Sequence, residues 1–258
     1  MKRLMSSIIG IGLLWGLAMP AQAQAPSASE REAELLRIWY EIRETAATRG
    51  DPEAKYDIAV ANMQARGTRM DEAKGLEWLQ RAANRGHADA HYYLAFLYTE
   101  GRIVTRDTAR SLEHYRQAAA LGHADSQYRM GIAYATGEGV TADIPTAIDW
   151  MTRAAQQNIA GAQYYLGQVY ETGRGATANV SIALDWYRAA ANNGEALAQQ
   201  RLADLYAAGR NVPQDLTEAF YWYNRAGNEA RKSEISRQMS QAQLATANQR
   251  IQSSQAQP

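Results

Sequence analysis

The chain has 258 residues, with 27 basic and 27 acidic side chains and no cysteine. This balanced charge excludes a strongly basic protein, so neither nucleic acid nor an anionic membrane is expected as the main partner. The lack of cysteine excludes disulfides, so the fold must rely on a large core or on strong repetition.

Residues 1–23 have the pattern of a secretory signal peptide. Lys2 and Arg3 precede an apolar run over residues 8–19, which is followed by the small-residue motif AQA. We expect cleavage after Ala23, or two residues later. The apolar run is too short to span a bilayer, which needs about 20 residues. The mature protein is therefore expected to be periplasmic or secreted and not membrane-spanning.

Residues 29–50 carry the second half of a pattern that recurs along the chain. Trp78 follows Ile42 by 36 residues, and Gly86 follows Gly50 by the same interval. Since no first half precedes it, we expect this segment to form an unpaired helix, a half-repeat that caps the N-terminal end. A solenoid needs such caps because its end units otherwise expose an apolar face.

Residues 51–230 contain five copies of a 36-residue unit, with no insertion or deletion between them. Residues at equivalent positions of the copies form columns. Repetition at a fixed interval of this length is typical of a solenoid. Two of the columns are Trp78, His114, Trp150, Trp186 and Trp222, and Gly101, Gly137, Gly173 and Gly209.

Each copy predicts two amphipathic helices, which we call helix A and helix B. In the second copy, Ala90, Leu94 and Tyr98 fall on one face of helix A. Helix A is expected to end at Gly101, because glycine readily adopts the positive φ that follows a helix end. A column of N-cap residues then starts each helix B. These are Asp71, Asp107, Asp143, Asn179 and Asp215, the last with Glu218 in the spacing of a capping box.

The C-terminal segment is more polar than the repeats. Residues 231–247 place Ile235 and Met239 one helical turn apart, which predicts a C-terminal capping helix. Residues 248–258 are rich in glutamine and serine and are expected to form a disordered tail.

The fourth copy carries a distinctive set of residues. They are Ala162, Tyr164-Tyr165-Leu166-Gly167, Tyr170, Gly173-Arg174-Gly175, Ala183, Asp185-Trp186-Tyr187, Ala190-Ala191 and Gly194. This set resembles the Sel1-like repeat family, a relative of the tetratricopeptide repeat. The first and last copies depart from it, with Ala65 and Asn211 in place of loop glycines. The resemblance implies an all-α, right-handed α/α solenoid that binds other proteins, often as an adaptor in signalling or envelope assembly.

Candidate catalytic and metal-binding residues are few. His87 and His91 have a spacing that can bind a metal, but His123 repeats His87 after 36 residues, so we interpret His87 and His123 as turn residues. The chain lacks HExxH, GxSxG and SxxK motifs. We therefore expect no enzyme, no cofactor and no metal site. An envelope enzyme acting on β-lactams or peptidoglycan is the alternative that the resemblance suggests.

Helix A also has columns that vary between copies, and these indicate binding because packing has not fixed them. By analogy with tetratricopeptide solenoids, they lie on the concave surface, where they form a groove for a peptide or protein segment from the cell envelope. Polysaccharide binding is the alternative ligand class, and burial of the same residues against neighbouring helices is the structural alternative. The candidate residues are Tyr93, Phe96, Arg129, Ile132, Tyr165 and Arg201.

Overall fold

The computed structural model describes residues 27–255, so the predicted signal peptide lies outside the described residues. This part of the chain consists of thirteen α-helices and contains no strand. No helix within it combines the length and the hydropathy needed to cross a membrane. The helices are α1 (Ala28–Thr48), α2 (Pro52–Gln64), α3 (Glu72–Ala83), α4 (Ala88–Glu100), α5 (Thr108–Ala120), α6 (Ala124–Thr136), α7 (Ile144–Gln156), α8 (Ala160–Thr172), α9 (Val180–Asn192), α10 (Ala196–Ala208), α11 (Leu216–Arg225), α12 (Glu229–Ser236) and α13 (Gln241–Gln255).

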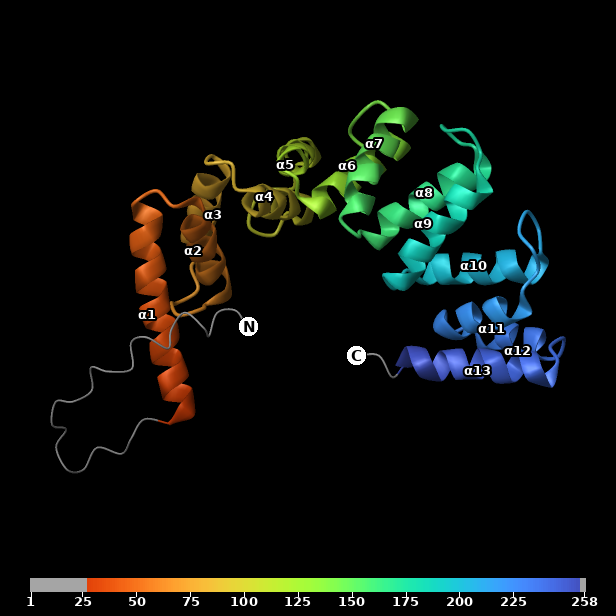
Figure 1. The fold of residues 1–258 in the computed structure, drawn as a ribbon. Coiled ribbons are helices and arrows are strands. Elements are labelled where there is room, and N and C mark those ends of the chain that lie inside the picture. Colours follow the sequence, from red (N-terminus) through yellow and green to blue (C-terminus); the bar gives the residue numbers. More distant parts are fainter. Residues whose placement is uncertain (1–26, 256–258) are drawn as a thin grey trace.

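The helices of the repeats form a linear array in which each one packs mainly on its neighbours along the chain, whereas α13 packs on α11. Helix A of the five repeats is α2, α4, α6, α8 and α10, and helix B is α3, α5, α7, α9 and α11. Figure 1 shows the array bent into an arch, with α4 and α6 on its inner side and α5 and α7 on its outer side. The predicted all-α solenoid of five helix-turn-helix repeats is confirmed.

The turn between helix A and helix B is closed in the same way in every repeat. In the third repeat, the Asp143 side chain accepts a hydrogen bond from the backbone N–H of Thr146 at 3.4 Å. The backbone N–H of Asp143 donates to the carbonyl of Tyr134, near the end of α6, at 2.9 Å. The predicted N-caps are thus confirmed, and each one also ties helix B back to helix A. The equivalent residues are Asp71, Asp107, Asn179 and Asp215.

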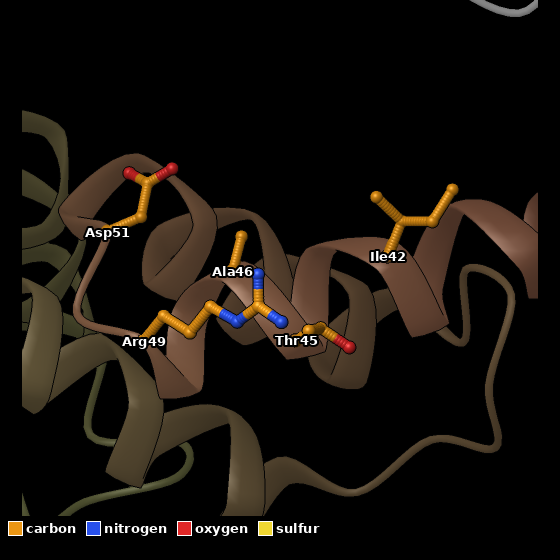
Figure 2. Close-up of a pocket in the computed structure, with 5 residues that line it drawn as sticks. All are labelled: Ile42, Thr45, Ala46, Arg49 and Asp51. Atoms are coloured by element: carbon orange, nitrogen blue, oxygen red, sulfur yellow. The ribbon is translucent and has the colours of Figure 1, made fainter.

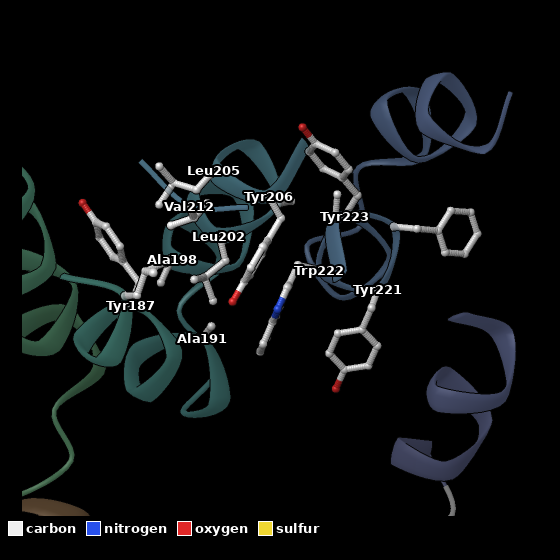
Figure 3. Close-up of a cluster of buried hydrophobic side chains, with 14 of the residues drawn as sticks. Tyr187, Ala191, Ala198, Leu202, Leu205, Tyr206, Val212, Tyr221, Trp222 and Tyr223 are labelled. Carbon is white, nitrogen blue, oxygen red and sulfur yellow. The ribbon is translucent and has the colours of Figure 1, made fainter. Parts of the chain in front are cut away.

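Small residues allow the paired helices to approach closely. Gly167 of α8 lies against the ring of Tyr187 of α9, where an added Cβ would come within 2.5 Å of a ring carbon. Gly131 of α6 faces the side chain of Met151 of α7 in the same way. Figure 3 shows the C-terminal core cluster, in which Tyr187 and residues of α10 and α11, including Leu202, pack together.

A buried polar column links each repeat to the next. Gln127, Gln163 and Gln199 are buried at equivalent positions of helix A. Each side-chain amide donates to the carbonyl of the residue eight positions earlier, at 3.0 to 3.3 Å. These bonds satisfy carbonyl groups at the end of the preceding helix B, which are left free by the helix geometry. Lys55 and His91 occupy the same column in the first two repeats.

The N-terminal helix α1 covers the segment expected to form a half-repeat. Its Tyr40 is buried, and the hydroxyl accepts hydrogen bonds from Asn62 of α2 at 3.0 Å and from the Lys74 ammonium at 3.1 Å. The opposite side of α1 is apolar but open, with Leu35 46% and Ile42 54% exposed. The helix therefore closes the core of the first repeat without burying its own outer face.

The C-terminal end differs from the prediction of one capping helix over 231–247 and a disordered tail over 248–258. Two helices follow the last repeat, and the second continues to Gln255. Ser240 and Gln243 start α13 with reciprocal side-chain to backbone hydrogen bonds, which is a capping box. Arg250 then anchors the helix, because it pairs with Glu218 and lies over the ring of Tyr221 at 3.9 Å.

The same contact explains why the capping box predicted for Asp215 and Glu218 is wrong. The Asp215 side chain caps α11 as expected. The Glu218 carboxylate instead accepts a hydrogen bond from the indole N–H of Trp222 at 3.1 Å and pairs with Arg250. A tertiary ion pair with α13 thus replaces the local contact that the spacing suggested.

Replacing Asp143 with alanine tests the importance of the turn. We expect Asp143→Ala to lower the free energy of unfolding by about 1 kcal/mol, because the side chain that caps α7 is lost. Chemical denaturation followed by circular dichroism measures the change. Asp149→Ala is the matched control, since Asp149 is an exposed residue of the same helix. Equal stability of the two variants would contradict the role of the cap.

Candidate functional site

The inner side of the arch is formed by the faces of helix A that turn away from helix B. In α4, Leu94 and Leu97 are buried in the cluster shared with α3, and Ala95 packs with Tyr115 of α5. The remaining face of α4 presents Tyr93, which is half-buried, and Phe96, which is 44% exposed. The centroids of the Tyr93 and Phe96 rings lie 6.3 Å apart, so the two side chains form one aromatic surface.

Neighbouring repeats extend this surface. Ile132 of α6 and Tyr165 of α8 are half-buried and pack against the same core cluster, around Met151 and Leu166. Burial raises the pKa of the Tyr165 hydroxyl above its usual value. Direct contacts between α6 and α8 join the inner sides of the third and fourth repeats.

Arg129 of α6 is the unpaired cation of this surface. It is exposed and belongs to no ion pair among residues 27–255. Two other charged residues of the same column are engaged, Asp57 by Arg43 of α1 and Arg201 by Glu171 of α8. The Arg129 guanidinium is therefore free to pair with a group of another molecule and to donate several hydrogen bonds to it.

Arg201 has a structural partner instead. Its guanidinium donates to the carboxylate of Glu171, which also accepts the hydroxyl of Tyr187 at 2.7 Å. Burial raises the pKa of Glu171, but the hydrogen bonds from Arg201 and Tyr187 outweigh burial, so its pKa lies below the usual value. Burial and the bond to Glu171 raise the pKa of Tyr187. This network links α8, α9 and α10.

Five of the six predicted residues form one surface, which we call the inner patch. Arg201 is left out because of its ion pair with Glu171. The patch combines apolar and aromatic area with one unpaired cation, a composition suited to binding another molecule. Its members are Tyr93, Phe96, Arg129, Ile132 and Tyr165.

A tyrosine column beside the inner patch was missed by the sequence analysis, although its 36-residue spacing could have revealed it. Tyr56 stacks on His87 with ring centroids 4.6 Å apart, and Tyr92 stacks on His123 at 4.3 Å. Burial, with a smaller effect from the negative charge of nearby Asp89, raises the pKa of Tyr56 to about 12. The equivalent residues of the third and fourth repeats are Tyr128 and Tyr164.

The histidines take two different roles. The side chains of His87 and His123 accept hydrogen bonds from backbone N–H groups and cap α4 and α6, which confirms their interpretation as turn residues. His91 does not pair with His87. Its Nδ1 lies 3.0 Å from Nδ1 of His114, on α5. Within residues 27–255, no group of three or more histidine, cysteine or acidic side chains is arranged to hold a metal ion.

A shallow pocket lies on the open side of α1 (Figure 2). It is lined by Ile42, Thr45, Ala46, Arg49 and Asp51. Ile42 and Ala46 lie one turn apart on the same side of the helix, as Figure 2 shows. The pocket is far along the chain from the inner patch and contains no pair of groups suited to catalysis.

Comparison with known proteins places the chain in a family. The Sel1 repeat profile matches five consecutive segments, residues 52–87, 88–123, 124–159, 160–195 and 196–229, which together make up more than half of the sequence. The protein belongs to the Sel1 repeat family. Each matched segment of this Sel1 repeat protein consists of one helix A followed by its helix B. A search of curated proteins gave no significant match.

Solved structures show the same architecture. A Sel1 repeat protein from Oxalobacter formigenes is similar with a TM-score of 0.66 and 25% sequence identity, over 76% of this chain and 83% of its own. A protective antigen of uropathogenic Escherichia coli strains with the same fold gives a TM-score of 0.50 at 25% identity. That match covers 82% of this Sel1 repeat protein and 54% of the antigen.

The Glu171 network predicts a pH-dependent contribution to stability. Glu171→Gln should lower the free energy of unfolding at pH 7 by about 1–2 kcal/mol, because Arg201 and Tyr187 lose their charged acceptor. Since the pKa of Glu171 is lowered in the folded protein from the usual 4.5, this contribution is present above pH 4.5 and is lost on acidification. The difference in the free energy of unfolding between wild type and Glu171→Gln should therefore become smaller at acidic pH.

Urea unfolding at a series of pH values measures that difference. Glu100→Gln serves as the control, because Glu100 is an exposed residue at the end of α4 and has no hydrogen-bonded partner in the described chain. If the difference in the free energy of unfolding between wild type and Glu171→Gln did not change with pH, the carboxylate charge would not be what stabilises the network.

Proposed function

We propose that this Sel1 repeat protein is a non-enzymatic interaction scaffold that holds a peptide or protein segment on the inner patch. One observation carries the proposal. Phe96, 44% exposed, lies beside Tyr93 on α4, while the unpaired Arg129 occupies the next helix A along the array. Aromatic residues and arginine are the types most enriched at the energetic centres of protein interfaces.

The arrangement also indicates the chemistry of the ligand. Phe96 offers an apolar contact, and Arg129 offers a charge-assisted, bidentate contact to a carboxylate. Helix α5 lies between α4 and α6, so these two helices are separated by two interaxial distances of about 8–10 Å each, on the order of 20 Å, which an extended peptide covers in about six residues. The segment that fits best therefore carries an apolar side chain and an acidic side chain about six positions apart.

Polysaccharide is the weaker alternative for the same surface. Sugar rings bind to the open faces of aromatic side chains, but in the tyrosine column beside the patch, stacking on His87 and His123 covers one face of Tyr56 and of Tyr92. A neutral glycan also has no anionic group that could pair with Arg129. We therefore favour a peptide or protein as the partner.

We further propose that the protein acts in the cell envelope or outside the cell. The basic start, the apolar run and the AQA motif of residues 1–23 support export. Protein recovered from the periplasm or medium should begin at Gln24, or two residues later, as determined by N-terminal sequencing. An intact residue 1 on protein that stays in the cytoplasm would contradict export, while leaving the inner patch unaffected.

Substitutions in the inner patch test the scaffold. The probes are fluorescein-labelled ten-residue peptides with Phe or Leu placed about six positions from Glu, and a matching set with Lys in place of Glu. We expect the acidic set to bind more tightly. Phe96→Ala and Arg129→Ala should each weaken binding about tenfold or more, the size of a loss at an interface hot spot. Fluorescence polarisation measures the dissociation constants.

Two control variants remove similar side chains elsewhere. Leu197 is 59% exposed on α10, and Arg237 is exposed at the end of α12. Leu197→Ala and Arg237→Ala should leave binding unchanged. The proposal fails if the acidic and lysine sets bind equally, or if the control variants weaken binding as much as the patch variants do.

A further inference from the structure

The pair formed by His91 and His114 is unlike any other contact in the array. His91 belongs to α4 and His114 to α5, and their Nδ1 atoms lie 3.0 Å apart. Both side chains are half-buried, so the pair is held within the repeat but open on one side. The ring of His114 is also fixed from its other side, because it stacks on Tyr98 with an angle of 8° between the ring planes.

Comparison with the other repeats shows that neither histidine is required by the fold. The column of His91 otherwise contains Lys55 or a buried glutamine, and the column of His114 otherwise contains tryptophan. The second repeat is the one copy in which both positions are histidine. His91 also lies close to the backbone of Ala83, eight residues earlier, which is the position that the glutamines of the other repeats reach.

The separation of the two nitrogen atoms matches the spacing of two ligands on one metal ion. Bonds from imidazole nitrogen to a divalent transition metal are about 2.0–2.1 Å long, so two neighbouring ligands on one ion lie about 2.9–3.4 Å apart. We propose that Nδ1 of His91 and Nδ1 of His114 bind a divalent transition metal ion between α4 and α5, with water completing the coordination.

The surroundings favour neutral imidazoles, the form that binds metals. Burial lowers the pKa of His91 and of His114 below the usual value of 6.5, and a positive charge on His91 would lower the pKa of His114 further. On binding, the Nδ1–H···Nδ1 hydrogen bond is replaced by two bonds to the metal. The displaced proton moves through solvent to Nε2 of the same ring, so both rings remain neutral.

Charged side chains near the two histidines act on them electrostatically and are not proposed as metal ligands. Glu113 lies close enough to favour a cation at both rings. Hydrogen bonds from Arg116 and Gln117 lower its pKa to about 2, so it stays ionised, and both of its oxygens are already engaged by these donors. Arg110 has the opposite electrostatic effect on His114.

Two protein ligands, both imidazoles, select the kind of metal. Imidazole suits copper, nickel and zinc, and among divalent ions of the first row copper binds most tightly. The site lies two residues from Tyr93, so an ion that joins α4 to α5 would also make the helix that carries the aromatic part of the inner patch more rigid.

Titration with Cu²⁺ tests the site. The purified protein, prepared without a polyhistidine tag, is titrated at pH 7.5 by calorimetry, and the bound copper is examined by electron paramagnetic resonance. We expect one site per chain with hyperfine coupling to two imidazole nitrogens. His91→Gln and His114→Trp should each weaken binding by at least about tenfold, the loss typical of even an outer-shell change at a metal site.

These two substitutions introduce the residues that other repeats have at the same positions, so both variants are expected to fold, as circular dichroism will check. His123→Asn is the control, because it removes a histidine that caps α6 while keeping a capping side chain. It should bind copper like the wild type. The site is disproved if wild type binds no copper at micromolar concentration, or if the variant carrying both substitutions binds it equally well.

Discussion

The structure depends on one turn, used five times. At each turn, the N-cap side chain holds the first turn of helix B, and the backbone N–H of the same residue reaches back to a carbonyl of helix A. Because one residue makes both contacts, the angle between the two helices is set locally and repeats with little variation. The arch, with α4 and α6 along its inner side, is a consequence of that repetition (Figure 1).

A periodic framework gives special meaning to residues that break the period. Packing and capping account for the columns that repeat, such as the glutamines that close the preceding helix B. They do not account for the exposed ring of Phe96, the unpaired Arg129, or the two histidines of the second repeat. These exceptions cluster on α4, α5 and α6, which makes the second and third repeats the chemically distinctive part of the array.

The repeating features could be predicted from the sequence because each depends on contacts within a few residues. The N-cap column and the glycine that ends helix A are of this kind. The exceptions depend on partners far along the chain. Arg201 meets Glu171, 30 residues earlier, and Glu171 belongs to a column with no consistent residue type. Arg250 meets Glu218 across 32 residues, and this contact orders a segment whose composition suggested a tail.

The central claim is that the inner side of the arch is the binding surface. The most direct measurement is photo-crosslinking in intact cells, with a benzophenone amino acid in place of Phe96 in one variant and of Ile182 in another. Ile182 is 38% exposed on a helix B, α9, and so offers a comparable apolar position away from the patch. The account predicts a defined protein adduct at position 96 and none at position 182. An adduct at 182 with none at 96 would contradict it.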